Sequence, residues 1–291
     1  MEPVPVLEIG GTHVTAALVD DAAVQVAARR PLPACGSATE ILDGIAAAAA
    51  TLDAPTGAQW GVAVPGPFDY AAGIGLFRDV GKFDALYGVD VGAELTRRLP
   101  TPSALRFLND ADAFGIGEYV SGAAAGHPRA VCLTLGSGVG SAFLDHGVPV
   151  NDGPLVPPDG SAHLLRFDDR PLEETVSRRA IRAAYGLVTN AEAPDVQAIA
   201  ERARGGEAVA KTVLDSAFHA LGTTIGPWLT TFGATVLVVG GSIAASWDLI
   251  EGPLRAGLRT DVELRAASRP ADAALVGAAW WATISQAVPT P

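Results

Sequence analysis

The sequence predicts an α/β protein made of two similar lobes, because of its composition and because one pattern occurs twice. Of the 291 residues, 49% are hydrophobic, 18% are charged and 33 are glycine, which is typical of folded α/β enzymes. Strand-like runs around a glycine turn open the chain, and the same arrangement restarts at Ala130. An internal duplication of one βββαβα unit explains this repetition. We therefore expect two lobes hinged over a cleft.

The first half is expected to begin with an antiparallel meander. β-rich runs at Val4–Ile9 and His13–Val19 are separated by Gly-Gly-Thr, and Ala22–Ala28 adds a third strand. Apolar residues at helical spacing then indicate a helix over Ala38–Leu52. The remaining elements of this half are expected at Gly61–Val64 (strand), Val91–Leu99 (helix), Leu105–Leu108 (strand) and Ala111–Val120 (helix).

The second half repeats the hairpin and is then rich in helices. The stretch "AVCLTLGSGVGSAFLDHG" is a strand, a glycine-rich turn and a second strand, and "ATVLVVGGSIAASWDLI" is a strand, a turn and a helix. Further helices are expected at Glu173–Tyr185, Asp195–Arg204, Glu207–Phe232 and Asp272–Ile284. We place the small N-terminal lobe at residues 1–108 plus 272–291, and the large C-terminal lobe at residues 109–271.

Charge and cysteine usage exclude several classes of protein. A formal net charge of −12 disfavours nucleic acid and anionic membranes as partners. The sequence shows neither a basic leader segment nor about 18 uninterrupted apolar residues, so the cytoplasm is the expected location. Cys35 and Cys132 are far apart and adjoin apolar segments, which predicts two buried free thiols and no disulfide framework.

Three glycine-rich turns are the candidate phosphate-binding elements. A turn without Cβ atoms exposes backbone N–H groups to an anion, although Gly10-Gly11-Thr12 alone does not differ from an ordinary hairpin. The equivalent Gly136-Ser137-Gly138 and the pair Gly240-Gly241 make a polyphosphate site the better interpretation. The chain has no GxxxxGK[ST], and a strand-like run follows "GSGVGS", so neither a P-loop nor a dinucleotide-binding fingerprint is present.

Six motifs together resemble the ROK family of sugar kinases and repressors, within the actin/hexokinase/Hsp70 superfamily. They are "LEIGGTHVTAALVD", "VAVPGPFDYAAGIGLF", "FLNDADAFGIGEY", "LTLGSGVGSAFLDHG", "LEETVSRRAI" and "VLVVGGSIA", and the match runs from about residue 4 to residue 285. The resemblance implies a two-lobed actin-like ATPase fold of the duplicated, ribonuclease H-like kind, with the active site in the cleft between the lobes. It also implies a glucokinase-like homodimer that transfers phosphate from ATP, with Mg²⁺, to the primary 6-hydroxyl of a hexose or hexose analogue.

The resemblance carries over residue by residue to these motifs. It implies that Asp110 is the catalytic base, which accepts the proton of the attacking alcohol. Glu8 stands where the family usually has aspartate, and we expect it to face the water shell of Mg²⁺. The donor is assigned to Gly10, Gly11, Thr12 and His13, to Gly136, Ser137, Gly138 and Gly140, and to Gly240, Gly241 and Ser242 near the adenosine. The sugar is assigned to Asn109, Asp110, His163 and Glu173 and to the turn at Gly66 and Pro67.

Structural roles remain open beside these functional ones. Asp110 also suits the N-cap of the helix that follows it, and a cap geometry would itself fix the carboxylate. Asp112 is expected to be a solvated acid of the first helical turn, and Glu174 a surface charge. The Pro65-Gly66-Pro67 turn, with Asp69, either frames the sugar or is only a rigid turn.

The sequence departs from the family pattern on the acceptor side and at the first phosphate loop. Gly160 stands where Glu-x-Gly-His would have its glutamate, and the cysteines of the family's zinc loop are absent, so we expect no zinc site. An altered pocket, with Asp159 or water replacing the glutamate, would suit an amino sugar such as kanosamine or a C7-cyclitol, while glucose stays open. His13 replaces a lysine that many members carry, which removes a positive charge unless the histidine is protonated.

Two other functions compete with that of an ATP-dependent sugar kinase. Polyphosphate could replace ATP as the donor, but a net charge of −12 offers no obvious basic track for a long polyanion. A non-catalytic sugar sensor is the rival from another class, and ROK repressors carry a helix-turn-helix ahead of the first phosphate loop. Here that loop begins ten residues into the sequence, and Asp110 and the glycines are kept. A kinase is therefore the preferred function.

Overall fold

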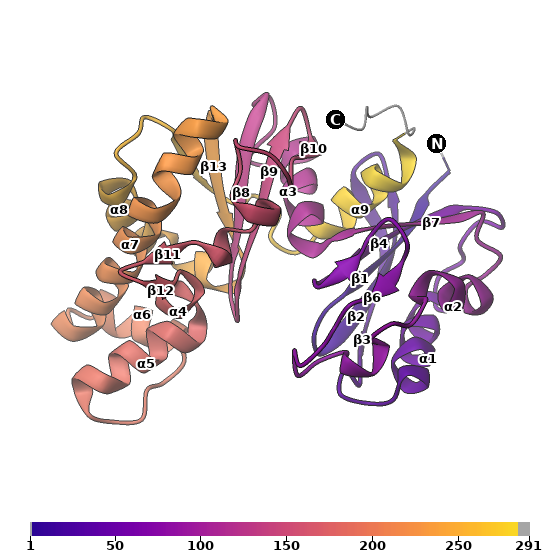
Figure 1. The fold of residues 1–291 in the computed structure, drawn as a ribbon, viewed down its shortest axis with the longest axis horizontal. Coiled ribbons are helices and arrows are strands. Elements are labelled where there is room, and N and C mark those ends of the chain that lie inside the picture. Colours follow the sequence, from indigo (N-terminus) through magenta and orange to yellow (C-terminus); the bar gives the residue numbers. More distant parts are fainter. Residues whose placement is uncertain (1, 285–291) are drawn as a thin grey trace. The chain divides into compact units, whose positions relative to one another are not determined.

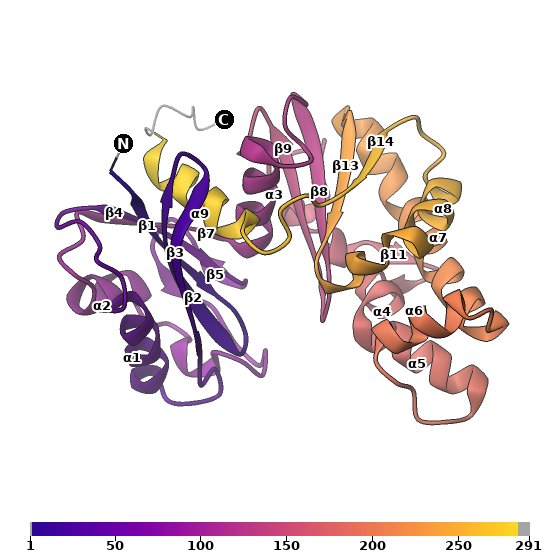
Figure 2. The same cartoon turned by 180° about the vertical axis from the view of Figure 1, so that it is seen from behind.

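The computed structural model describes residues 2–284, which form two compact units (Figures 1 and 2). Unit 1 runs to Ser121 and includes the segment that begins at Ala271, and unit 2 is Gly122–Pro270. The first boundary thus lies thirteen residues later than the one expected after residue 108, because the helix after Asn109 packs against the last helix of the chain. Asp110 therefore belongs to unit 1.

Unit 1 is built on a five-stranded sheet in the order β3-β2-β1-β4-β7. The first three strands form the expected antiparallel meander, and β4 and β7 run parallel to β1. The strands are β1 (Val4–Ile9), β2 (His13–Asp20), β3 (Ala23–Pro31), β4 (Gln59–Val64) and β7 (Ala104–Asn109), with a small hairpin of β5 (Phe68–Asp69) and β6 (Ile74–Gly75). The helices are α1 (Ala38–Ala49), α2 (Val91–Arg98), α3 (Asp110–Ser121), α9 (Ala273–Thr283) and a 3₁₀ turn at Asp84–Leu86.

Helices cover both faces of this sheet. Helix α1 begins with a reciprocal cap, in which Ser37 Oγ accepts the Glu40 N–H and the Glu40 carboxylate accepts the Ser37 N–H. Its buried residues join the core that contains Trp60 and Val62 of β4. Gly61, between those two, faces the other way and touches α9, since a Cβ there would lie 2.1 Å from the Ala278 carbonyl oxygen.

Glycines also let α3 and α9 pack at backbone distance. A Cβ on Gly117 would lie 1.9 Å from the Ala273 carbonyl oxygen, and one on Gly277 would lie 1.8 Å from that of Ala113. Figure 1 shows α9, in yellow, lying beside α3 although most of the chain separates them in sequence. The first helix of this pair, α3, begins directly after Asn109, the last residue of β7.

Unit 2 repeats the strand order of unit 1. Its sheet runs β10-β9-β8-β13-β14, so in both sheets the third, second, first, fourth and fifth strands follow one another in space. The strands are β8 (Arg129–Leu135), β9 (Val139–Asp145), β10 (Val148–Pro149), β13 (Val236–Gly240) and β14 (Glu263–Ala266), with a small hairpin of β11 (Arg166–Phe167) and β12 (Arg170–Pro171). The shared order confirms the internal duplication predicted from the two hairpins.

The helices of unit 2 depart from expectation at one point. They are α4 (Glu173–Val176), α5 (Arg178–Thr189), α6 (Val196–Arg204), α7 (Ala208–Phe232) and α8 (Trp247–Leu258), with 3₁₀ turns at Pro158–Gly160, Ala162–Leu164 and Ser242–Ser246. The single helix expected over Glu173–Tyr185 is broken at Ser177. That residue is fully buried with extended backbone, and its Oγ accepts the Ala180 N–H to start α5.

Two further properties bear on the sequence analysis. In the part of the chain that the structure describes, none of the helices combines the length and the apolar character needed to cross a membrane. Cys132 is buried, as expected, but Cys35 is exposed, so that prediction was wrong for one thiol. Cys35 lies in the turn after β3, where its Sγ donates a hydrogen bond to the Gly81 carbonyl oxygen at 3.4 Å.

Candidate functional site

The first glycine turn joins β1 to β2 and is closed by its own backbone. The Gly10 N–H donates to the His13 carbonyl oxygen at 2.8 Å, and the Leu32 N–H donates to the Thr12 carbonyl oxygen at 2.9 Å. These two bonds fix both ends of the turn, while Thr12 itself is exposed. A turn closed in this way can offer the N–H groups between its ends to an anion.

His13 is paired with an arginine that the sequence analysis did not single out. The Arg29 guanidinium on β3 donates to His13 Nε2, which leaves the proton of the neutral ring on Nδ1, 2.9 Å from Thr12 Oγ1. Desolvation and the Arg29 charge both lower the pKa of His13, so it is neutral at pH 7. His13 therefore does not replace the positive charge of the lysine that many members of the family carry at this position. Arg29 carries a positive charge here instead.

Asn109 and Asp110 lie where β7 passes into α3. Asn109 Oδ1 accepts the N–H groups of Ala111 at 2.8 Å and Asp112 at 3.4 Å, so it caps the helix that Asp110 was considered to cap. Asp110 Oδ1 accepts a local bond from the Ala111 N–H at 2.9 Å. Asp110 is exposed, yet desolvation by the protein around it raises the pKa of its carboxyl group. A solvent-accessible carboxylate held at a helix start suits a base.

Asp112 was wrongly expected to be solvated. It is buried, with 5% of its surface exposed, and belongs to the run of buried residues that follows Asp110 in α3. Glu174 is exposed, as predicted.

Glu8 is half-buried at the end of β1, within electrostatic range of Asp110. Desolvation and then the Asp110 charge raise the pKa of Glu8, and Arg29 opposes them. Two carboxylates that repel one another in this way fit a hydrated divalent cation, which prefers oxygen ligands and keeps most of its water. In the described residues no group of three or more potential metal-binding side chains is found.

Tyr70 completes a polar cluster around the predicted sugar residues of unit 1. Asn109 Nδ2 donates to the Tyr70 hydroxyl at 2.9 Å, and that hydroxyl donates to the Val64 carbonyl oxygen at 3.3 Å. Burial raises the pKa of Tyr70 well above its usual range, so the phenol stays protonated. A Cβ on Gly66 would lie 3.4 Å from this hydroxyl, which places the glycine of the Pro65–Pro67 turn beside Asn109. Tyr70 lies within the motif "VAVPGPFDYAAGIGLF", but the sequence analysis gave it no role.

The second glycine turn, between β8 and β9, is tied to two helices of unit 2. The Gly136 N–H donates to the Gly138 carbonyl oxygen at 3.0 Å, and the Arg178 N–H donates to the Gly136 carbonyl oxygen at 2.8 Å. Glu173 Oε2 accepts the Val139 N–H at 3.1 Å and lies 2.7 Å from where a Cβ of Gly138 would stand. Glu173, predicted to bind sugar, therefore also supports the turn.

The third glycine pair lies beside the second turn. Gly241 has a φ of 83°, and a Cβ there would be 2.4 Å from the Leu135 carbonyl oxygen, so only glycine fits. Arg178 Nη2 donates to Ser242 Oγ at 2.9 Å, which joins α5 to this pair. The residues of 136–140 and 240–242 that were predicted to bind the donor thus lie close together. Arg178, which was not predicted, lies beside both groups.

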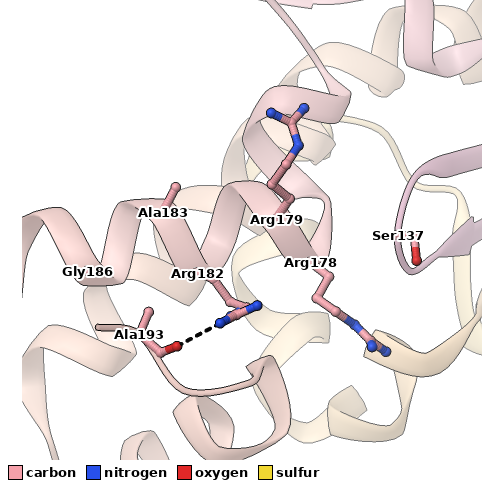
Figure 3. Close-up of a pocket in the computed structure, with 7 residues that line it drawn as sticks. All are labelled: Ser137, Arg178, Arg179, Arg182, Ala183, Gly186 and Ala193. Atoms are coloured by element: carbon pink, nitrogen blue, oxygen red, sulfur yellow. Dashed lines mark hydrogen bonds between the residues drawn. The ribbon is translucent and has the colours of Figure 1, made fainter. Parts of the chain in front are cut away.

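A cavity of about 540 Å³ opens beside Ser137. In Figure 3, Arg178 and Arg182 extend from α5, and Arg182 donates to the Ala193 carbonyl oxygen at 3.0 Å. The cavity is lined by Ser137, Arg178, Arg179, Arg182, Ala183, Gly186 and Ala193. The three guanidinium groups make the lining locally basic, in contrast with the net charge of −12, although Arg178 is also paired with Asp195 at 3.7 Å.

The comparison that decides the family covers most of the chain. The model of the ROK family matches residues 5–152 and 170–284. The chain belongs to the ROK family. It is a sugar kinase, a phosphotransferase that acts on a sugar hydroxyl, with the actin-like ATPase fold that the sequence analysis expected.

Characterised relatives cover comparable lengths. A glucokinase of Thermotoga maritima is 29% identical over 218 residues, 67% of each chain. A ROK family glucokinase from Streptomyces griseus, solved in complex with glucose and AMPPNP, has 23% identity and a TM-score of 0.78, with 95% of this chain and 98% of that one covered. An inorganic polyphosphate/ATP-glucomannokinase from Arthrobacter sp. strain KM has 26% identity and a TM-score of 0.68, with 97% and 98% covered.

The segment between the two matched ranges holds the departures from the ROK pattern on the acceptor side. Gly160 is buried with a φ of 63°, and a Cβ there would lie 2.6 Å from Asn151 Oδ1, so this backbone does not suit a glutamate. Ser141 Oγ donates to the Gly160 carbonyl oxygen at 2.7 Å and accepts the Ala162 N–H at 2.8 Å. The exposed Asp159 and His163 flank this fixed point.

Proposed function

We propose that this ROK kinase transfers the γ-phosphoryl group of ATP to the primary 6-hydroxyl of a hexose or a close analogue. The carrying observation is Asp110, a solvent-accessible carboxylate with a raised pKa at the start of α3, beside the polar pair Asn109 and Tyr70. A primary alcohol attacks phosphorus better while its proton is being accepted, and a carboxylate with a raised pKa is the better acceptor. Asn109 and Tyr70 would orient the sugar hydroxyls.

The donor would be held by backbone N–H groups and one metal ion. The turn at Gly10–Thr12 and the turn at Gly136–Gly140 would bind phosphate oxygens, and Gly240–Ser242 with Arg178 would lie near the adenosine. Mg²⁺, when bound, neutralises charge on the phosphates. Glu8 would orient the water shell of the ion, and its proximity to Asp110 supports this placement. The complex of the Streptomyces griseus glucokinase with AMPPNP supports ATP as the donor.

The acceptor is proposed to be a glucose-like hexose read by a modified pocket. Relatives include glucokinases and an N-acetyl-D-glucosamine kinase of Pectobacterium carotovorum, which supports a pyranose acceptor. Because Gly160 removes a charged acceptor group, an amino sugar or a C7-cyclitol is the alternative. His163 and Glu173 remain the proposed ligands on this side of the ring.

The test is a coupled ADP-release assay with MgATP. We would compare glucose, mannose, glucosamine, N-acetylglucosamine, 3-amino-3-deoxyglucose and a C7-cyclitol, with Asp110→Asn as the control enzyme. Turnover of at least one acceptor that is lost in Asp110→Asn is expected. Undiminished turnover in that variant would exclude Asp110 as the base, and a marked preference for glucose would exclude a change of acceptor at Gly160.

Polyphosphate as a second donor is favoured by one observation. The cavity beside Ser137 is lined by three arginines, of which Arg178 is also paired with Asp195 at 3.7 Å, so it carries positive charge that the net charge alone did not predict. The Arthrobacter glucomannokinase, whose name includes both donors, supports the comparison. Sugar phosphate formed from polyphosphate without nucleotide, and competed by ATP, is the expected result. No product under those conditions would leave ATP as the donor.

A further inference from the structure

Lys82 lies against the first phosphate turn. A Cβ built on Gly11 would be 2.6 Å from Lys82 Nζ and 2.8 Å from its Cδ, so the lysine side chain crosses the open face of that glycine. The residue is exposed, in the loop that precedes the 3₁₀ turn at Asp84. The Lys82 ammonium group therefore occupies the space that Gly11 leaves free because it has no side chain.

The position of Lys82 is fixed through the backbone. The N–H of the next residue, Phe83, donates to the Ala34 carbonyl oxygen at 2.7 Å, and Phe83 is 2% exposed within the unit 1 core. Two residues before Ala34, the Leu32 N–H is bonded to Thr12 of the turn. The segment 32–34 therefore holds Lys82 and the phosphate turn in one framework.

In the described part of the chain, the Lys82 ammonium group has no carboxylate partner. The nearest acidic residue in sequence, Asp84, accepts the N–H groups of Val80 at 3.0 Å and Gly81 at 3.1 Å. Within residues 2–284, no ion pair to Lys82 is found. The chain contains only two lysines, and the other, Lys211, is paired with Asp215 at 2.5 Å.

We propose that Lys82 binds phosphate oxygens of the nucleotide held at Gly10–Thr12. A lysine ammonium is a compact phosphate-binding group, and glycine lets it and the anion approach the same turn. Lys82 would then add to Arg29 the positive charge that neutral His13 does not supply. The inference rests on the proposed function, namely that this turn binds the phosphates of the donor.

Kinetics of three variants form the first test. Lys82→Met removes the charge and keeps the length, Lys82→Arg keeps the charge, and Lys211→Met is the matched control because its lysine is paired elsewhere. We expect Lys82→Met to raise KM for ATP about tenfold or more, in line with a lost charged hydrogen bond. KM for the sugar and the melting temperature should stay unchanged, Lys82→Arg should restore part of the loss, and Lys211→Met should behave as the parent.

Chemical labelling of the unaltered protein separates this inference from the proposed function. Acylation of lysine amines, read by mass spectrometry, should label Lys82 readily, and MgATP should protect it while Lys211 stays unprotected. ATP binding is measured in parallel by calorimetry. ATP that binds without protecting Lys82, or a Lys82→Met variant with the parent's KM for ATP, overturns the inference and leaves the kinase intact. Absence of ATP binding overturns both.

Discussion

Asp110 and Glu8 place function and stability in opposition. Their carboxyl groups have raised pKa values, so ionising them at neutral pH costs folding free energy, and this cost would accompany the proposed base and the proposed metal-facing carboxylate. Asp110→Asn removes one of these charges and keeps the local bond geometry. We expect its melting temperature at pH 7 to rise while kcat falls by about 10²- to 10⁴-fold, as for loss of a general base. A variant that melts lower would contradict this account.

The pH dependence follows from the same shifts. A base must be ionised, so a raised pKa moves the acidic limb of kcat/KM above the ordinary aspartate value of about 3.9. Stability changes in the opposite sense: the penalty is present above the folded pKa values and disappears as pH falls through them. A rate profile measured from pH 3 to 8 should show this limb, and a limb at or below the ordinary value would rule out the raised pKa.

The residues that sequence reasoning missed share one property. Each of them lies beside predicted residues of its own unit: Arg29, Tyr70 and Lys82 in unit 1, and Arg178 in unit 2. Strand register, a loop contact or a helix start brings them there, and motif spacing does not encode those contacts. The glycines and Asp110 could be selected from the sequence because their chemistry is local to a turn or to a strand end. Asp112 and Cys35 were misjudged because burial depends on neighbours that are distant in sequence.

At the scale of elements, the contact between α3 and α9 depends on glycine. Gly277→Ala would place a methyl group 1.8 Å from the Ala113 carbonyl oxygen, so the helices must separate. We expect a loss of about 3 kcal/mol in unfolding free energy, typical of severe overpacking. Gly252→Ala is the matched control, since this exposed glycine of α8 has no atom within 4 Å of its added Cβ and should be neutral or stabilising. Denaturant titration measures both, and equal effects would refute the packing argument.

Strands and hairpins were predicted closely because alternation and glycine turns are local signals. β1 has the predicted bounds, and β2 extends the predicted strand by one residue. The break at Ser177 was missed, because a buried serine that caps a new helix looks like one more residue of an amphipathic run. Strand β14 was missed because its four residues pair only at the edge of the unit 2 sheet (Figure 2).

At the scale of the whole molecule, the absence of the family's zinc cysteines predicts a fold that does not depend on zinc. The segment that contains Gly160 and Ala162 is held in place instead by hydrogen bonds of the Ser141 side chain. We expect elemental analysis to find no stoichiometric zinc and a zinc-selective chelator to leave the melting temperature unchanged, whereas removal of Mg²⁺ abolishes turnover. A chelator-induced loss of structure would contradict this. A homodimer remains a prediction from the family, testable by sedimentation.

The placement of α9 affects the order in which the protein can fold during synthesis. Unit 2 is one continuous stretch of chain, whereas unit 1 needs α9, which is synthesised after unit 2. Until α9 emerges from the ribosome, Gly61 and the glycine face of α3 lack the helix they pack against. Unit 2 can therefore complete its core first, and Asn109 and Asp110 acquire their final support among the last events of folding.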